Sequence, residues 1–244
     1  MKLFSVILIS LIFLSSCANE NNQTFEANLL VKPQFEFNNK FISCNLNKDF
    51  TLINLESFLS NFIKDQSFNN NYDISILFPL SEKVIKFIIN YRNYYDENSY
   101  NIFLDKLSNK GIDEIASCNF DDAMFQGYSL SILDTYDQPS PYTVEILRCN
   151  YNQGYNYGIF RVALDRFISE VNALDILYEA EYLQNEEDNS SFIWINKFYS
   201  QDFSNDISSK WFVGSYAAEI KKEFSENANC IDAKIFNAYK ISKL

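Results

Sequence analysis

The cysteines restrict the fold of this 244-residue chain more than any other feature. Four of the five form two pairs, Cys44 with Cys118 and Cys149 with Cys230, and each pair encloses a segment of similar length. When the two segments are aligned without gaps from Cys44 and Cys149, identical residues coincide at Asn45/Asn150, Asn47/Asn152, Leu59/Leu164, Phe62/Phe167 and Ile63/Ile168. Internal similarity of this kind is typical of repeated folding units. The sequence therefore predicts a duplication.

The N-terminus has the pattern of an export signal. Lys2 precedes an apolar run from Leu3 to Leu14, and the chain becomes polar after Cys17. A run of about a dozen residues is too short to cross a hydrocarbon core of ~30 Å as a helix. We therefore expect residues 1–16 to be a signal peptide.

The sequence Leu14-Ser15-Ser16-Cys17 resembles the lipobox of bacterial lipoproteins. That resemblance implies a lipid on Cys17, which would hold the protein at a membrane. Ala18 follows the cysteine, which by the same resemblance favours the outer membrane. The alternative is ordinary cleavage after Ala18, which would give a soluble periplasmic protein.

Two copies of one element pattern follow. Hydrophobic periodicity predicts strand 41–45, a helix from Leu52 capped by Thr51, strands 73–78 and 84–91, helix 99–108 and strand 125–131. The second copy contains strand 144–150, a helix capped by Asn156, strands 175–180 and 192–198, helix 206–226 and strand 236–242. The order βαββαβ is that of a ferredoxin-like unit, in the α+β class.

Export allows disulfides to form. Four cysteines permit three connectivities, which counting alone cannot distinguish. In a ferredoxin-like unit the first strand lies beside the last in the opposite direction, and this predicts the bridges Cys44–Cys118 and Cys149–Cys230. The alternative is four free buried cysteines.

This cysteine placement, with an aromatic third strand such as Phe192-Ile193-Trp194-Ile195, resembles poorly characterised bacterial proteins related to the dimeric α/β-barrel superfamily. The resemblance implies two ferredoxin-like sheets packed face to face as an intramolecular pseudo-dimer. We expect a lipidated N-terminus and tether at 17–39, a first unit at 40–135, a linker at 136–141 and a second unit at 142–244.

The chain contains no histidine, which excludes histidine-dependent triads and haem ligation through histidine. The cysteine spacing lacks a zinc pattern, and no glycine motif fits a phosphate-binding loop. We therefore assign no catalytic residue, metal or cofactor. Glu179 and Glu181 alternate with apolar residues on a predicted strand, and we expect both carboxylates to face solvent.

Four aromatic residues are candidates to line a ligand cavity, namely Tyr178, Tyr182, Trp194 and Trp211. Ordinary core packing is the alternative explanation for them. Asn90 and Asn196 occupy matching places on the two predicted third strands, a recurrence that more often marks a turn or cap than a site.

The formal net charge is −12, or −13 without Lys2, and therefore argues against a nucleic-acid partner.

Because no catalytic constellation is visible, the leading interpretation is a noncatalytic, lipid-anchored envelope protein that binds an unknown protein partner or small molecule. The alternative is a cofactor-independent enzyme resembling barrel monooxygenases or isomerases. A purely structural envelope component is a third possibility.

Overall fold

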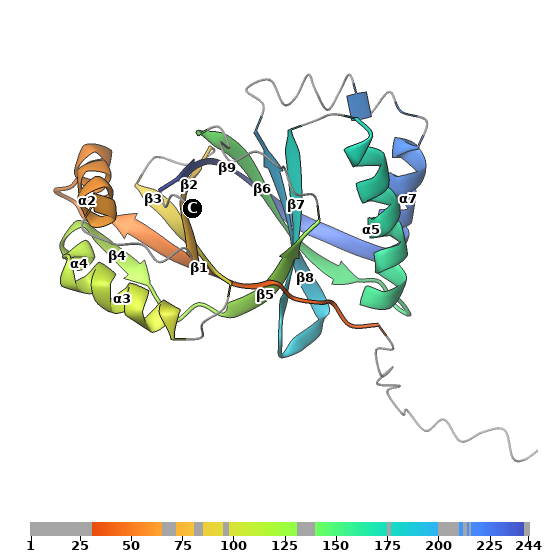
Figure 1. Ribbon diagram of the computed structural model, residues 1–244, viewed down its shortest axis with the longest axis horizontal. Coiled ribbons are helices and arrows are strands. Elements are labelled where there is room, and N and C mark those ends of the chain that lie inside the picture. Colours follow the sequence, from red (N-terminus) through yellow and green to blue (C-terminus); the bar gives the residue numbers. More distant parts are fainter. Residues whose placement is uncertain are drawn as a thin grey trace, which may run out of the picture. The chain divides into compact units, whose positions relative to one another are not determined.

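A computed structural model describes residues 31–64, 72–80, 85–94, 98–130, 140–174, 177–199, 210–211, 214 and 216–241 (Figure 1). Cys17 and the predicted signal peptide lie outside the described residues, as does the start of the helix expected from 206. Val31–Leu244 forms one compact unit. All that follows concerns the described residues of this unit.

The first half has the elements β1 (Phe37–Leu46), α2 (Leu52–Lys64), β2 (Tyr72–Pro79), β3 (Lys86–Asn93), α3 (Ser99–Asn109), α4 (Ile112–Ile115), β4 (Ala116–Asn119) and β5 (Met124–Ser129). The second half has β6 (Tyr142–Tyr151), α5 (Tyr157–Asn172), β7 (Tyr178–Asn185), β8 (Asp188–Phe198), α7 (Ala217–Asn227) and β9 (Ala228–Lys240). β1 begins three residues before the boundary expected at residue 40. The short elements α4 and β4 were not expected.

The strands form one antiparallel sheet in the order β3-β2-β9-β6-β8-β7-β5-β1-β4. β1 also pairs with β3, so eight of the nine strands close into a ring, and β4 extends along the end of β1. The two halves meet through the pairs β2–β9 and β5–β7. The predicted α+β class is confirmed, with a large antiparallel sheet.

Both predicted cysteine pairs are at disulfide distance. The S–S separation is 2.05 Å for Cys44–Cys118 and also for Cys149–Cys230. Each pair lies directly opposite across two neighbouring strands, β1 with β4 and β6 with β9. Cys118 and Cys230 thus lie within strands rather than before them.

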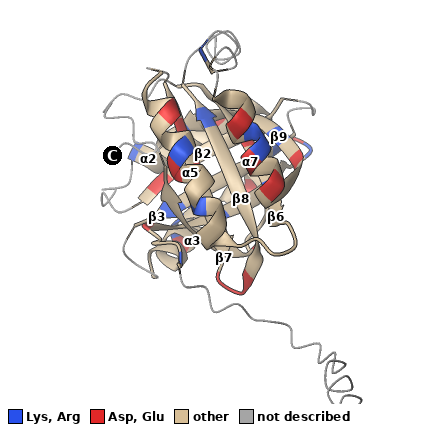
Figure 2. Ribbon diagram, turned by 90° about the vertical axis from the view of Figure 1, so that its right-hand side faces the viewer, with Lys and Arg blue, Asp and Glu red and all other residues tan. Residues whose placement is uncertain are grey.

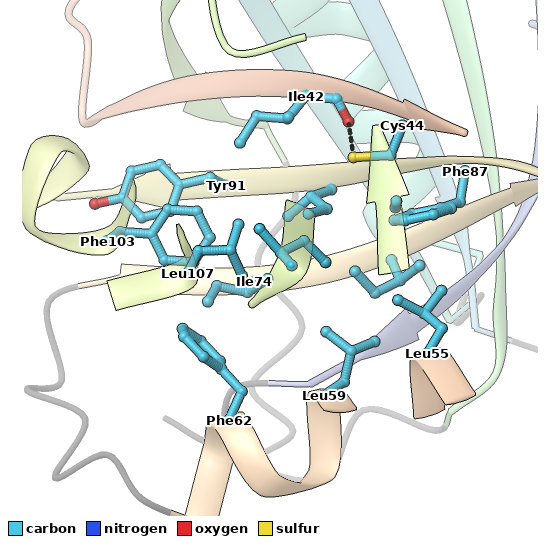
Figure 3. Close-up of a cluster of buried hydrophobic side chains, with 14 of the residues drawn as sticks. Ile42, Cys44, Leu55, Leu59, Phe62, Ile74, Phe87, Tyr91, Phe103 and Leu107 are labelled. Atoms are coloured by element: carbon cyan, nitrogen blue, oxygen red, sulfur yellow. Dashed lines mark hydrogen bonds between the residues drawn. The ribbon is translucent and has the colours of Figure 1, made fainter. Parts of the chain in front are cut away.

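Burial divides the apolar residues into three clusters. One lies between α2, α3 and the first half of the sheet, where Leu55, Leu59 and Phe62 of α2 point toward the strands (Figure 3). A second lies between α5, α7 and the second half of the sheet. The third, around Phe37, Leu183 and Phe236, lies on the opposite face of the strands, inside the ring. Both faces of the sheet therefore carry buried side chains.

The matching residues Asn47 and Asn152 make the same contacts in the two halves. The Asn47 side chain donates to the carbonyl oxygens of Asp113 and Glu114 at 3.1 and 2.8 Å. The Asn152 side chain donates to those of Ser225 and Glu226, both at 2.9 Å. Each asparagine thereby ties the end of the first strand to the helix that precedes the second cysteine of its pair, which is α4 in the first half and α7 in the second.

We predict that Asn47→Ala and Asn152→Ala each lower the melting temperature by about 1–4 °C, because carbonyl groups at a helix end lose their donor. Thermal unfolding monitored by circular dichroism measures the change. Asn45→Ala is the matched control, since Asn45 is an exposed residue two positions earlier in the sequence. Equal effects of all three substitutions would contradict the prediction.

Candidate functional site

A cavity of about 740 Å³ lies between the helices α5 and α7 and the sheet of the second half. Aromatic side chains make up much of its wall. Tyr178, Trp194 and Trp211, three of the four residues expected to line a cavity, are among them, with Phe160, Phe167, Phe192, Phe198 and Phe224. Lys221 of α7 is the one charged residue among the described lining residues. A cavity of this size and composition suits a small apolar molecule.

Tyr182, the fourth residue expected to line the cavity, belongs to the packed core instead. Its side chain is fully buried and stacks on Phe192 with ring centroids 5.1 Å apart. Its hydroxyl lies 3.0 Å from the hydroxyl of Tyr151.

A network of hydrogen-bonded polar side chains, centred on Asn196, lies at the cavity wall. Asn196 Oδ1 accepts hydrogen bonds from the Tyr178 hydroxyl and from Trp194 Nε1, each at 2.6 Å. Asn196 Nδ2 donates to Glu145 Oε2 at 2.7 Å. Glu145 and Asn196 lie opposite each other on β6 and β8, so the sheet itself holds the amide in place. These contacts fix the amide orientation, with oxygen toward two donors and nitrogen toward the carboxylate.

Burial raises the pKa of Tyr178 above its ordinary value, and the neighbouring negative charge of Glu145 raises it further. The phenol therefore stays protonated at neutral pH and above. It can act as a hydrogen-bond donor or a general acid, but not as a resting phenolate.

In the first half, the position that corresponds to Asn196 is occupied by a large aromatic side chain. Phe87 lies opposite Cys44 and Phe192 opposite Cys149, so in this register Tyr91 of β3 corresponds to Asn196 of β8. Tyr91 is fully buried and stacks on Phe103 of α3 at 4.7 Å (Figure 3). A large ring thus takes the place of the small amide.

The expected match of Asn90 with Asn196 is wrong by one residue. Neighbouring strand residues face opposite sides of a sheet, so a shift of one position exchanges the two faces. Asn196 faces the helices and the cavity. Asn90 precedes Tyr91, which faces the helices, and therefore points into the ring.

The expected exposure of Glu179 and Glu181 is also wrong, because both are buried inside the ring. Glu181 pairs with Arg92 of β3 and with Lys197 of β8. Lys197 Nζ also lies 3.5 Å from Glu179, whose second oxygen accepts a hydrogen bond of 2.7 Å from the Tyr199 hydroxyl. The alternation along β7 was read correctly, but both of its faces are covered.

Burial alone would raise the pKa of Glu181, but the charges of Arg92 and Lys197 and the hydrogen bonds from both outweigh burial and lower that pKa to about 2. Burial and the charge of Arg92 would lower the pKa of Lys197, whereas Glu179 and Glu181 raise it, and the net direction is upward. Arg92, Glu181 and Lys197 are therefore charged at neutral pH.

Within the described ranges no three His, Cys, Asp or Glu residues are arranged to hold a metal ion. Haem held through histidine does not fit this chain, which has no histidine. The cavity-lining sulfur of Cys230 is in a disulfide, and the Tyr178 hydroxyl is bonded to Asn196.

Basic and acidic residues are interspersed along α5 and α7 (Figure 2). Arg166 of α5 bridges to Glu219 and Glu223 of α7, which links the two helices over the cavity.

None of the helices in the described part of the chain has the length and apolar character needed to span a membrane.

No family model matches the sequence, and no curated protein matches it. Solved structures do match the fold. A candidate monooxygenase from Lactobacillus acidophilus NCFM has a TM-score of 0.56 at 6% identity, covering 84% of this chain and 94% of its own. A candidate monooxygenase from Fusobacterium nucleatum has a TM-score of 0.54 at 11% identity, covering 86% and 94%. A variant chlorite dismutase from Candidatus Nitrospira defluvii has a TM-score of 0.54 at 9% identity, covering 86% and 94%.

The chain thus shares its fold with these solved structures, which supports the expected resemblance to dimeric α/β-barrel proteins at the level of the fold. Identities this low establish a shared fold and leave the reaction open. The neighbours carry the names of enzymes, which contradicts the leading interpretation of a noncatalytic envelope protein and favours the enzyme alternative.

We predict that Glu181→Gln reduces the loss of stability in acid. Because the carboxyl has a lower pKa in the folded protein than its ordinary 4.5, the wild type loses stability as the pH falls from about 4.5 toward 2. Denaturant unfolding between pH 6 and 3 measures this dependence. Glu186→Gln, in the exposed turn between β7 and β8, is the control and should keep the wild-type slope. Parallel curves for wild type and Glu181→Gln would contradict the assignment.

Proposed function

We propose that the protein is a cofactor-independent enzyme of the monooxygenase or isomerase kind, and that the cavity of the second half is its active site. The observation that carries this proposal is the fixed Tyr178–Asn196–Glu145 group in an otherwise largely apolar cavity. A few oriented polar groups within an apolar wall are typical of sites that bind and orient a small molecule. The fold neighbours support the same class of function.

The aromatic wall selects a flat, apolar substrate, because ring faces pack well against one another. One N–H of the Asn196 amide donates to Glu145, which leaves the second to donate to a substrate oxygen. The protonated Tyr178 hydroxyl lies beside the same amide. The second Asn196 N–H would stabilise the negative charge on a carbonyl or phenol oxygen once the substrate has lost a proton to solvent water. The single proton of the Tyr178 hydroxyl stays on Asn196 Oδ1 and fixes the orientation of the amide.

The two candidate reactions share this first step. An isomerase would return the proton at another carbon. A monooxygenase without a resident cofactor requires a substrate anion that itself gives electrons to O₂. In both reactions Glu145 positions the Asn196 amide by accepting its hydrogen bond. The negative charge of Glu145 also favours the protonated form of Tyr178.

We further propose that Cys17 is lipidated and anchors the protein at the outer membrane, with a soluble periplasmic form as the alternative. The lipobox-like sequence supports the anchor, and the two disulfides suit an oxidising compartment. No nucleic-acid partner is proposed, in keeping with the acidic composition.

We also propose that the two halves are copies of one ferredoxin-like unit, packed as a pseudo-dimer within one chain. The equivalent hydrogen bonds of Asn47 and Asn152 and the equivalent disulfides support this origin. The halves then diverged, one toward a packed core and the other toward a cavity.

We predict that the purified protein consumes O₂ or isomerises a substrate in a panel of hydroxylated polycyclic aromatic compounds. Asn196→Leu should lower kcat/KM by about 10²-fold or more, since it removes the donor to the developing charge. Tyr178→Phe should lower it less, since it removes only a hydroxyl that orients the Asn196 amide. An oxygen electrode and absorbance spectra measure the two reactions. Tyr72→Phe, at the corresponding position of the first half, should retain wild-type activity. An active wild type whose rate is unchanged by either cavity substitution would contradict this site.

We predict that the protein expressed with its own N-terminus in a Gram-negative host partitions into the outer-membrane fraction. Cys17→Ser should release it from membranes, because the acyl chains supply the anchor. Intact mass spectrometry detects the lipid. An unmodified mature protein beginning after Ala18 would support the soluble form instead.

A further inference from the structure

Unpartnered polar atoms gather inside the ring. Six buried side-chain nitrogen or oxygen atoms of the described residues have no hydrogen-bond partner, and five of them belong to Asn39, Asn90, Arg92 and Glu181. They are both polar atoms of the Asn39 amide, Asn90 Oδ1, Arg92 Nε and Glu181 Oε2. Asn39 and Glu181 are completely buried. A buried polar atom without a partner destabilises the fold, because it has lost its hydrogen bonds to water without replacement, so this grouping needs a physical explanation.

The four residues are neighbours around Arg92. Asn39 of β1 lies directly opposite Arg92 of β3. Asn90 is two residues before Arg92 on the same strand and therefore points to the same side. Glu181 bonds to the Arg92 guanidinium from across the ring. The guanidinium also lies over the Phe37 ring at 4.0 Å from the centroid, which holds it in place.

We propose that this group of residues is an internal binding site for small neutral molecules that both donate and accept hydrogen bonds, occupied by ordered water. The inference is independent of the proposed enzyme activity, because the site lies on the opposite face of the sheet from the cavity.

The unpartnered atoms define the chemistry of the occupant. Asn39 Nδ2 and Arg92 Nε are donors, whereas Asn39 Oδ1, Asn90 Oδ1 and Glu181 Oε2 are acceptors. An anion would satisfy only the donors, and a cation only the acceptors. The buried charges already balance, with Arg92 and Lys197 against Glu179 and Glu181. A hydroxyl group meets both requirements, and a buried water typically makes about three hydrogen bonds to such groups.

A crystal structure of the wild-type protein at 1.5 Å or better tests the proposal directly. We expect density within hydrogen-bond distance of Asn39, Arg92 Nε and Glu181 Oε2. Density that refines as water, or as a retained alcohol or sugar, supports the site, since both supply hydroxyl groups. Density that refines as a metal or an inorganic anion, or no density at all, overturns it.

Two substitutions at Asn39 give an independent measurement. If the site is hydrated, Asn39→Leu removes partners of the bound water and should lower the melting temperature by about 3–8 °C. Asn39→Ser should lower the melting temperature less, because serine keeps a hydroxyl group and leaves room for another water. If the site is dry, the order reverses, because leucine removes an unpaired amide and serine leaves an empty space. Asn38→Leu, at the adjacent position whose side chain faces the other side of β1, is the control for the change in strand propensity. A leucine variant as stable as the serine variant, or more stable, overturns the proposal.

Discussion

Closure of the sheet is the constraint on which the other features of this protein depend. The pairs β2–β9 and β5–β7 join the two halves edge to edge, and β1–β3 completes the ring. Closure protects strand edges that would otherwise pair with other chains. It also covers the inner face of the strands where the two halves meet, so that residues of both parities are buried along β7. Three cores arise from this arrangement, and the candidate active site and the buried charge cluster lie on opposite faces of the same strands.

The local elements could be predicted because they depend on short-range pattern. Asn156 caps α5 by accepting a hydrogen bond from the Ile159 amide at 3.2 Å, as expected, and both cysteine pairs face each other. The exposure of Glu179 and Glu181 was mispredicted, because the alternation was interpreted as if one face of β7 met water. The expected face-to-face packing of two sheets already implied a covered inner face. Combining the two expectations would have placed both carboxylates in the interior.

The correspondence between the two halves could be followed only near the cysteines. Cys44 and Cys149 differ by 105 positions, and so do Phe87 and Phe192 opposite them. Between these points the loops from helix to strand differ in length, since α2 ends at Lys64 before Tyr72 and α5 ends at Asn172 before Tyr178. Similarity of residue type cannot fix an alignment across such loops. An error of one residue in the alignment therefore paired Asn90 with Asn196. Asn90 points into the ring, whereas Asn196 lies in the cavity wall.

The buried charges explain how a largely apolar structure keeps a unique register between its halves. Replacing a buried ion pair with apolar residues often leaves stability unchanged, whereas removing one partner is costly. Arg92 comes from the first half, and Glu181 and Lys197 from the second. A slip of one residue in β7 would move Glu181 to the helix side among aromatic rings, away from both cations. The cluster therefore penalises a one-residue slip of β7 relative to the register that places Tyr178 beside Asn196. The charge cluster inside the ring therefore helps to form the cavity on the other face of the sheet, because both depend on the alignment of the same strands.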